Sequence, residues 1–134
     1  MLSGYHRKTI NIFIPDPTAD KVIPLLRVPT GHTYTVEEFY VVPDTAAAAN
    51  AGTYWEASLQ NGGTAGTGTT VISGTAGGTA GWTALTAQSA TIVSGSGDLT
   101  AGQYLNLNYA ETGTISPGNF TVMLEVVDGI GSKA

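Results

Sequence analysis

The sequence predicts an all-β fold: an antiparallel β-sandwich, jelly-roll-like, with about eight or nine short strands. Three observations predict it. Several segments alternate apolar and polar residues, which is the period of a strand with one buried face. Turn signals built on Gly and Pro recur about every ten residues. No segment has the length and apolar period of an amphipathic helix that could cover a parallel sheet.

The first two predicted strands span residues 8–14 and 21–28. The first places Ile10, Ile12 and Ile14 on one face and ends before Pro17, because proline cannot donate to a sheet ladder. The second contains Pro24, which indicates an edge strand or two short strands split by a bulge.

The third strand begins at Tyr34, and its apolar parity changes near Glu37 and Glu38. A β-bulge at that point, or burial of both faces, would reconcile the pattern. The alanine-rich stretch 44–52 that follows predicts a single helical turn within a long loop. A fourth strand is predicted over 53–61, with its larger apolar residues on one face.

No charged residue occurs between Glu56 and Asp98. This Gly/Thr/Ala-rich segment contains short candidate strands at 70–73, 82–86 and 90–93. Two well-patterned strands follow within 99–128, and we expect them to form a hairpin. The expected organisation is a flexible N-terminal arm at 1–8, a β-sandwich domain at 9–128 and a C-terminal tail at 129–134.

No catalytic or metal-binding motif is apparent, so we expect a protein that is not an enzyme and binds no cofactor. Cysteine is absent, and the two histidines are His6 and His32. Glu37 and Glu38 are adjacent in a strand, so their side chains leave on opposite faces unless a partner is brought across the sheet. Asp16 and Asp20 flank a turn without the spacing of a calcium loop.

The net charge of −5, with five basic residues, disfavours nucleic-acid binding. No apolar run approaches the roughly 20 residues of a membrane-spanning helix. The aromatic residues could form a platform for sugar rings, although burial in the core is the favoured interpretation for the tryptophan that alternates with Ala57 and Leu59. The candidates for such a platform are Tyr54, Trp55, Trp82, Tyr104 and Tyr109.

Three stretches carry a resemblance to a known class of proteins: PTGHTYTVEEFYVVP, TYWEASLQNGGT and LTAGQYLNLNYAETGT with the following PGNFTVMLEV. They resemble small structural proteins of tailed bacteriophages, in particular head decoration (cement) proteins of the β-sandwich or jelly-roll type. The resemblance implies a virion protein on the capsid surface, assembled in the host cytoplasm, with the major capsid protein as partner. It also implies a homo-oligomer, with a trimer favoured, that cements neighbouring capsomers.

Two regions are expected to contact the capsid. One is the N-terminal arm, through Tyr5, His6, Arg7 and Lys8. The other is the uncharged loop region, through Thr64, Thr67, Thr79 and Trp82. The alternative function is a carbohydrate- or receptor-binding β-sandwich module of a phage fibre or tail, for which Trp82 is the best-placed loop aromatic.

Overall fold

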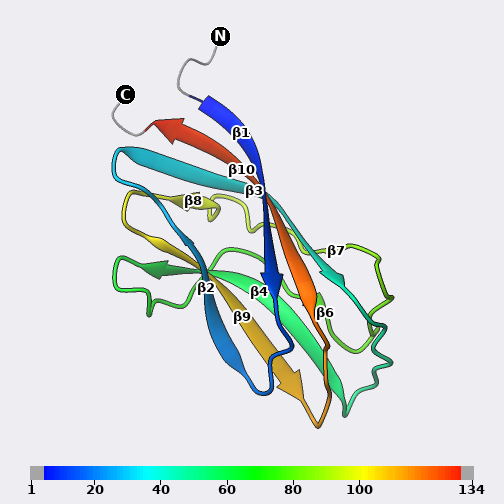
Figure 1. Cartoon of the computed structure of the whole chain (residues 1–134). Coiled ribbons are helices and arrows are strands. Elements are labelled where there is room, and N and C mark those ends of the chain that lie inside the picture. The colour runs from blue at the N-terminus through cyan, green and yellow to red at the C-terminus, as the bar shows by residue number, and fades with distance from the viewer. Residues whose placement is uncertain (1–4, 131–134) are drawn as a thin grey trace.

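The computed structural model describes residues 5–130, and within them the chain is entirely β-structure and loops. The ten strands, in chain order, are β1 (Tyr5–Ile14), β2 (Lys21–Arg27), β3 (His32–Pro43), β4 (Tyr54–Gly63), β5 (Thr70–Val71), β6 (Ala76–Gly77), β7 (Gln88–Ser89), β8 (Asp98–Leu99), β9 (Tyr104–Thr112) and β10 (Phe120–Ile130). Six are long, and β5 to β8 have two residues each (Figure 1).

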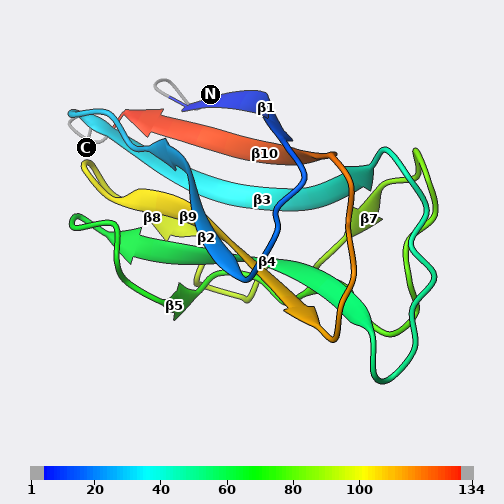
Figure 2. The ribbon, with the colours of Figure 1, turned by 60° about the horizontal axis from the view of Figure 1, so that its bottom comes forward.

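The strands form two antiparallel sheets packed face to face. Sheet A has the order β1-β10-β3, with β7 and β8 pairing the far side of β3, and sheet B has the order β2-β9-β4, with β5 and β6 pairing the far side of β4. Figure 2 shows β1, β10 and β3 in one layer and β9 and β4 in the other. Successive strands β1 to β4 alternate between the sheets, as in a jelly roll. The predicted jelly-roll-like sandwich is therefore confirmed, with ten strands in place of eight or nine.

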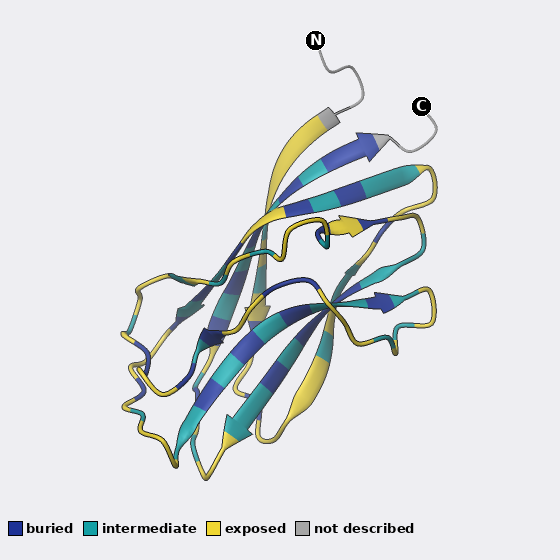
Figure 3. Cartoon of the chain, turned by 180° about the vertical axis from the view of Figure 1, so that it is seen from behind, coloured by how far each residue is buried: buried dark blue, intermediate teal, exposed yellow. Residues whose placement is uncertain are grey.

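The core lies between the sheets and is built from the alternating residues of the long strands (Figure 3). Trp55 is at its centre, with the Trp82 ring stacked 3.9 Å away and the Phe120 ring 5.0 Å away between centroids. The predicted inward faces of β4, β9 and β10 are all buried. Period-two patterning thus identified the core of the long strands.

Two expected irregularities are also present. Glu38 pairs with Glu125 and Val36 with Val126, so Glu37 is the extra residue of a β-bulge. Strand β2 is an edge strand, and its pairing with β9 shifts register between Pro24 and Leu26.

Three local predictions are wrong. The strands of the expected C-terminal hairpin lie in different sheets: β9 pairs with β2 and β4, and β10 with β1 and β3. The stretch 44–52 has no helical turn, because Ala47 forms a bridge with Trp82 and Asn50 forms one with Thr53. The candidate strands at 82–86 and 90–93 each contain only one isolated bridge, at Trp82 and at Ile92. The two-residue strand β7 comes after the first of these segments, and β8 comes after the second.

The domain boundaries also differ from the expected ones. Strand β1 begins at Tyr5, so residues 5–8 of the expected arm belong to sheet A, where they pair with β10. Strand β10 runs on to Ile130. The remainder of the expected arm and tail, 1–4 and 131–134, lies outside the described residues.

Candidate interaction surfaces

Arg7 is held by acidic residues of its own sheet. Its Nη1 atom lies 2.6 Å from the Glu37 carboxylate and 2.7 Å from that of Glu125. The hydrogen bonds to Glu125 and Glu37 raise the pKa of the Arg7 guanidinium. The bulge at Glu37 makes this arrangement possible, because it leaves both Glu37 and Glu38 exposed and turns Glu37 towards β1.

Lys8 takes part in a second ionic cluster, centred on Asp128. The Asp128 side chain is 4% exposed, with Lys8 Nζ 2.9 Å and His32 Nδ1 2.8 Å from its two oxygens. Burial alone would raise the pKa of the Asp128 carboxyl, but hydrogen bonds from Lys8 and His32 lower it below its ordinary value. Lys8 also lies over the Tyr34 ring, 5.2 Å from the centroid. Arg7 and Lys8, both on β1, thus have acidic partners within the chain.

These clusters do not assemble a metal centre among the residues that the structure describes. Within residues 5–130 no group of three or more His, Asp or Glu side chains could hold a metal ion. No helix in the described part of the chain has the length and apolarity to span a membrane. The carboxylates of Glu37 and Glu125 are both engaged by Arg7, and Glu38 accepts a hydrogen bond from Tyr40.

The predicted contact loops occupy two places on the sandwich. Strands β5 and β6 extend sheet B beyond β4, and β7 and β8 extend sheet A beyond β3, so residues 70–97 cover the flank opposite β1 and β2. The loop 64–69 instead lies over the outer face of sheet B, against β9 and β2. We call residues 64–97 the uncharged flank, because none of them is charged. Of the five large apolar residues that are most exposed, three lie on it: Val71, Leu85 and Val93.

The four predicted loop residues divide into two groups. Thr64, Thr67 and Thr79 are exposed, the first two in the loop after β4 and the third in the turn after β6. Trp82 is only 4% exposed, because its ring stacks on Trp55 and its Nε1 donates to the Trp55 carbonyl at 3.2 Å. Trp82 therefore belongs to the core, and little of its side chain is available for a contact.

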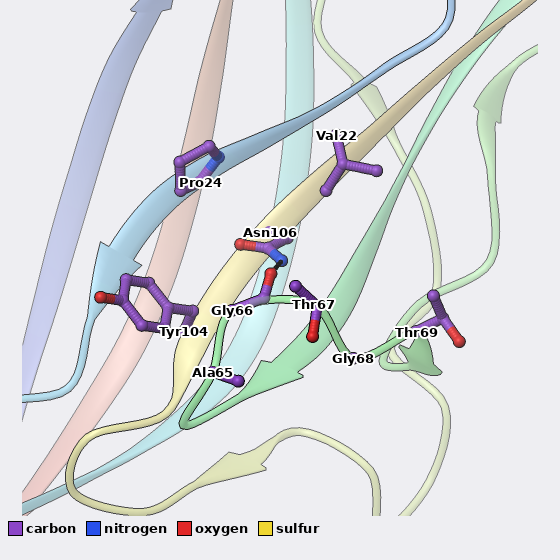
Figure 4. Close-up of a pocket in the computed structure, with 9 residues that line it drawn as sticks. All are labelled: Val22, Pro24, Ala65, Gly66, Thr67, Gly68, Thr69, Tyr104 and Asn106. Atoms are coloured by element: carbon purple, nitrogen blue, oxygen red, sulfur yellow. Dashed lines mark hydrogen bonds between the residues drawn. The ribbon is translucent and has the colours of Figure 1, made fainter.

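The aromatic platform does not form either. Trp55 and Tyr109 are buried with Trp82 in the core, and Tyr54 is half-buried in β4. Tyr104, at the start of β9, lines a cavity of about 440 Å³ on the outer face of sheet B. Figure 4 shows this cavity between β2, which contributes Val22 and Pro24, and the loop 65–69.

Asn106 contributes a buried amide to this cavity. Its Nδ2 donates to the Gly66 carbonyl at 2.9 Å, while its Oδ1 is buried without a hydrogen-bond partner. The Oε1 atom of Gln60, the residue opposite on β4, is in the same state. Alternation with the buried Leu105 and Leu107 puts Asn106 on the outer face of its strand. The pattern gives no sign of its burial, because the covering loop lies about 40 residues earlier in the chain.

Comparison of the chain with protein-family models, with curated proteins and with solved structures finds no match.

Proposed function

We propose that this protein is a non-enzymatic structural protein of a phage virion that binds the outside of the capsid and cements neighbouring capsomers. The observation that carries the proposal is the uncharged flank. A segment of 34 residues without one charge (64–97) is unusual on a chain that carries 15 charged residues elsewhere. Depletion of charge is the compositional mark of the centre of a protein interface.

The fold and the ionic clusters agree with this function. Jelly-roll sandwiches are common in virion proteins, where the work is contact rather than chemistry. Arg7 and Lys8 already have intramolecular partners, which favours the uncharged flank over β1 as the main contact with the shell. A trimer would link three weak contacts, so that its overall avidity for the shell exceeds the affinity of each contact. This arrangement suits a protein repeated in many copies over a shell.

The test mixes the purified protein with expanded, undecorated capsids of a phage whose genome encodes this chain. Wild-type protein is expected to bind them at a fixed copy number. Thr67→Glu and Thr79→Glu should each weaken binding about tenfold or more, because a charge would be desolvated in the interface. Thr18→Glu, an exposed position between β1 and β2, is the matched control and should bind as the wild type does.

Absence of binding by the wild-type protein would contradict the proposal. Equal binding by all three variants would place the contact elsewhere on the molecule. A gene located within the tail cluster would favour the second candidate function.

That second candidate is a saccharide-binding module of a fibre or tail, favoured by the cavity at Tyr104. Its lining is neutral, with one aromatic ring and an unpartnered amide oxygen, and jelly rolls also occur among lectin domains. A panel of neutral mono- and oligosaccharides screened by ligand-observed NMR tests it. Signals that Tyr104→Ala abolishes would support this function, and no signal with any sugar would contradict it.

A further inference from the structure

Strand β1 is a long edge strand without a partner on one of its sides. It pairs with β10 along all of Tyr5–Ile14 and is the last strand of sheet A on that side. Within residues 5–130, no loop forms a backbone hydrogen bond with it. Figure 3 shows this strand, next to the N-terminus, exposed along most of its length. Its outward N–H and C=O groups therefore form a row to which another strand can add.

The other sheet edges carry features that block strand addition, and the second half of β1 lacks them. Strand β2, the edge of sheet B on the same side, contains Pro24 and a shift in register beside it. On the opposite side, the two-residue strands β5 to β8 leave only short edges. The first half of β1 carries Arg7 and Lys8, but residues 9–14 (TINIFI) contain no charge, proline or bulge.

Residues 9–14 have the side chains of a strand that is only half covered. Ile10, Ile12 and Ile14 face the core, but Ile10 and Ile12 are only partly buried. Phe13 points to the outer face and is 60% exposed. A short uncharged segment of β-branched and aromatic residues pairs readily with identical copies of itself. The occupant that fits this edge is therefore a second copy of the chain.

We propose that two copies of this protein associate through β1, with residues 10–14 of each copy paired antiparallel about a two-fold axis at Ile12. Sheet A then continues from one copy into the other. The interface lies opposite residues 70–97, so that side of each copy stays free. This inference does not depend on the proposed function, and it specifies a two-fold pair where the resemblance implies a trimer.

The isoleucines select the register of this pair. Directly opposed residues of an antiparallel pair face the same side of the sheet. Pairing about Ile12 sets Ile12 against itself and Ile10 against Ile14, so the apolar core side of sheet A continues across the axis. Asn11 and Phe13 oppose each other on the outer face, where the pairing covers part of the exposed Phe13 ring.

The surrounding charges agree with this register. The charged residues that border the segment are Arg7 with its partners Glu37 and Glu125, Lys8 with its partner Asp128, and Asp16 and Lys21 at the other end. Pairing about Ile12 sets Lys8 of one copy against Asp16 of the second, just beyond the paired segment. Pairing about Asn11 would instead set Lys8 against Ile14. A parallel pair in register would set Arg7 and Lys8 against themselves, which like charges disfavour.

Sedimentation equilibrium of the full chain measures the association without any capsid present. The wild type is expected to form a reversible dimer. Phe13→Lys should raise the dimer dissociation constant about tenfold or more, because it removes an apolar contact and adds two like charges near the axis. Val71→Lys is the matched control, since Val71 is 53% exposed on β5 at the opposite side, and this variant should dimerise as the wild type does.

Disulfide cross-linking tests the register, and the chain has no cysteine of its own. In Ile12→Cys the two thiols lie on directly opposed residues, about 4.5–5.5 Å apart at Cα, which suits a disulfide. Thr9→Cys is the control on the same strand, because its two copies lie about 20 Å apart along the paired strands. Under mild oxidation Ile12→Cys should give a covalent dimer, and Thr9→Cys should give none.

Several outcomes would overturn the inference. A wild type that stays monomeric at every concentration, or that forms a trimer, would contradict the two-fold pair. Undiminished dimerisation of Phe13→Lys without a cross-link in Ile12→Cys would contradict the role of β1, and equal cross-linking of both cysteine variants would contradict the register. If Phe13→Lys does not fold, the cross-linking decides alone. None of these measurements involves capsids, so this inference and the proposed function fail separately.

Discussion

Trp82 is expected in an exposed loop from the sequence, whereas the structure places it in the core. Its surroundings, GGTAGWTAL, have the composition of an exposed loop, yet the ring is buried against Trp55. Gly77 makes room for it: a Cβ at that position would lie 2.1 Å from the Trp82 ring. The partner ring lies 27 residues earlier in the chain, so composition alone could not reveal this stacking.

We therefore expect Trp82→Ala to lower the free energy of unfolding by about 3–5 kcal/mol, the range for removing a buried aromatic side chain. Urea denaturation followed by circular dichroism would measure it. The exposed neighbour Thr79 supplies the control, since Thr79→Ala should change stability by less than about 0.5 kcal/mol. A small effect at Trp82 would mean that the ring does not pack in the core in solution.

Protonation of Asp128 should change the stability of the folded protein measurably. Its pKa is lower in the folded protein than its ordinary value, because Lys8 and His32 donate to the carboxylate. The folded state therefore binds the Asp128 proton less readily than the unfolded state does. The resulting stability is fully present above the unfolded pKa of about 4 and is lost as the pH falls through the folded pKa.

Asp128→Asn should lower stability at pH 7 by about 1–2 kcal/mol, an estimate reduced for the partly exposed ends of Lys8 and His32. It should also flatten the decline in stability below about pH 4 relative to the wild type. Thermal unfolding across pH 2–7 measures both effects. The exposed residue Asp44 gives a charge-matched control, and an Asp44→Asn profile indistinguishable from that of Asp128→Asn would contradict the assignment.

At the scale of elements, period-two patterning located the long strands but could not assign them to sheets. The alternation in β9 and β10 is the same whether the two strands pair with each other or face each other across the core. The connection 113–119 contains turn residues in either case, and it spans from one sheet to the other. The hairpin prediction failed because strand pairing depends on partners from distant parts of the chain, here β1 to β4.

The bulge in β3 could be predicted, because it leaves a trace in the sequence. Buried residues change parity between Val36 and Phe39, and only an extra residue between them keeps both in the core. The two-residue strands β5 to β8 leave no such trace. Their length is below that of any periodic pattern, and they are defined by pairing with β3 and β4.

Deletion of Glu37 should therefore be tolerated, because Val36 and Glu38 already pair with the consecutive residues Val126 and Glu125. We expect a folded protein that loses only the exposed ion pair with Arg7, with a change in unfolding free energy of about 1 kcal/mol or less.

Deletion of Tyr40 is the matched control for the Glu37 deletion. It would move Val41 from the core to the outer face, which should destabilise by about 2 kcal/mol or more. Chemical denaturation of the two deletion variants compares them directly. Equal destabilisation would contradict the assignment of Glu37 as the bulged residue.

At the scale of the whole molecule, the jelly roll gathers most of the uncharged segment along one side, where the exposed Glu37 and Glu38 border residues 89–92. The sequence shows that the segment between Glu56 and Asp98 lacks charge, but not that residues 70–97 of it line one side of the protein. That follows from topology, because β5 to β8 extend both sheets beyond β3 and β4. The basic pair Arg7 and Lys8 lies on β1, at the opposite edge of sheet A. The expected arm and the expected loops are thus two distinct surfaces. The dependence of capsid binding on salt concentration would show which of the two makes the contact.

Binding through the uncharged flank should depend little on ionic strength, because few charges approach one another in the contact. Between about 50 and 500 mM NaCl, we expect the affinity for capsids to change by less than about threefold. Contact through Arg7 and Lys8 with acidic capsid groups would instead weaken about tenfold or more over this range, since the Debye length, beyond which exposed charges are screened, shortens from about 14 Å to about 4 Å. The Arg7→Gln variant separates the two cases further. Unchanged binding and unchanged salt dependence would support contact through the uncharged flank, whereas a loss of affinity would indicate contact through β1.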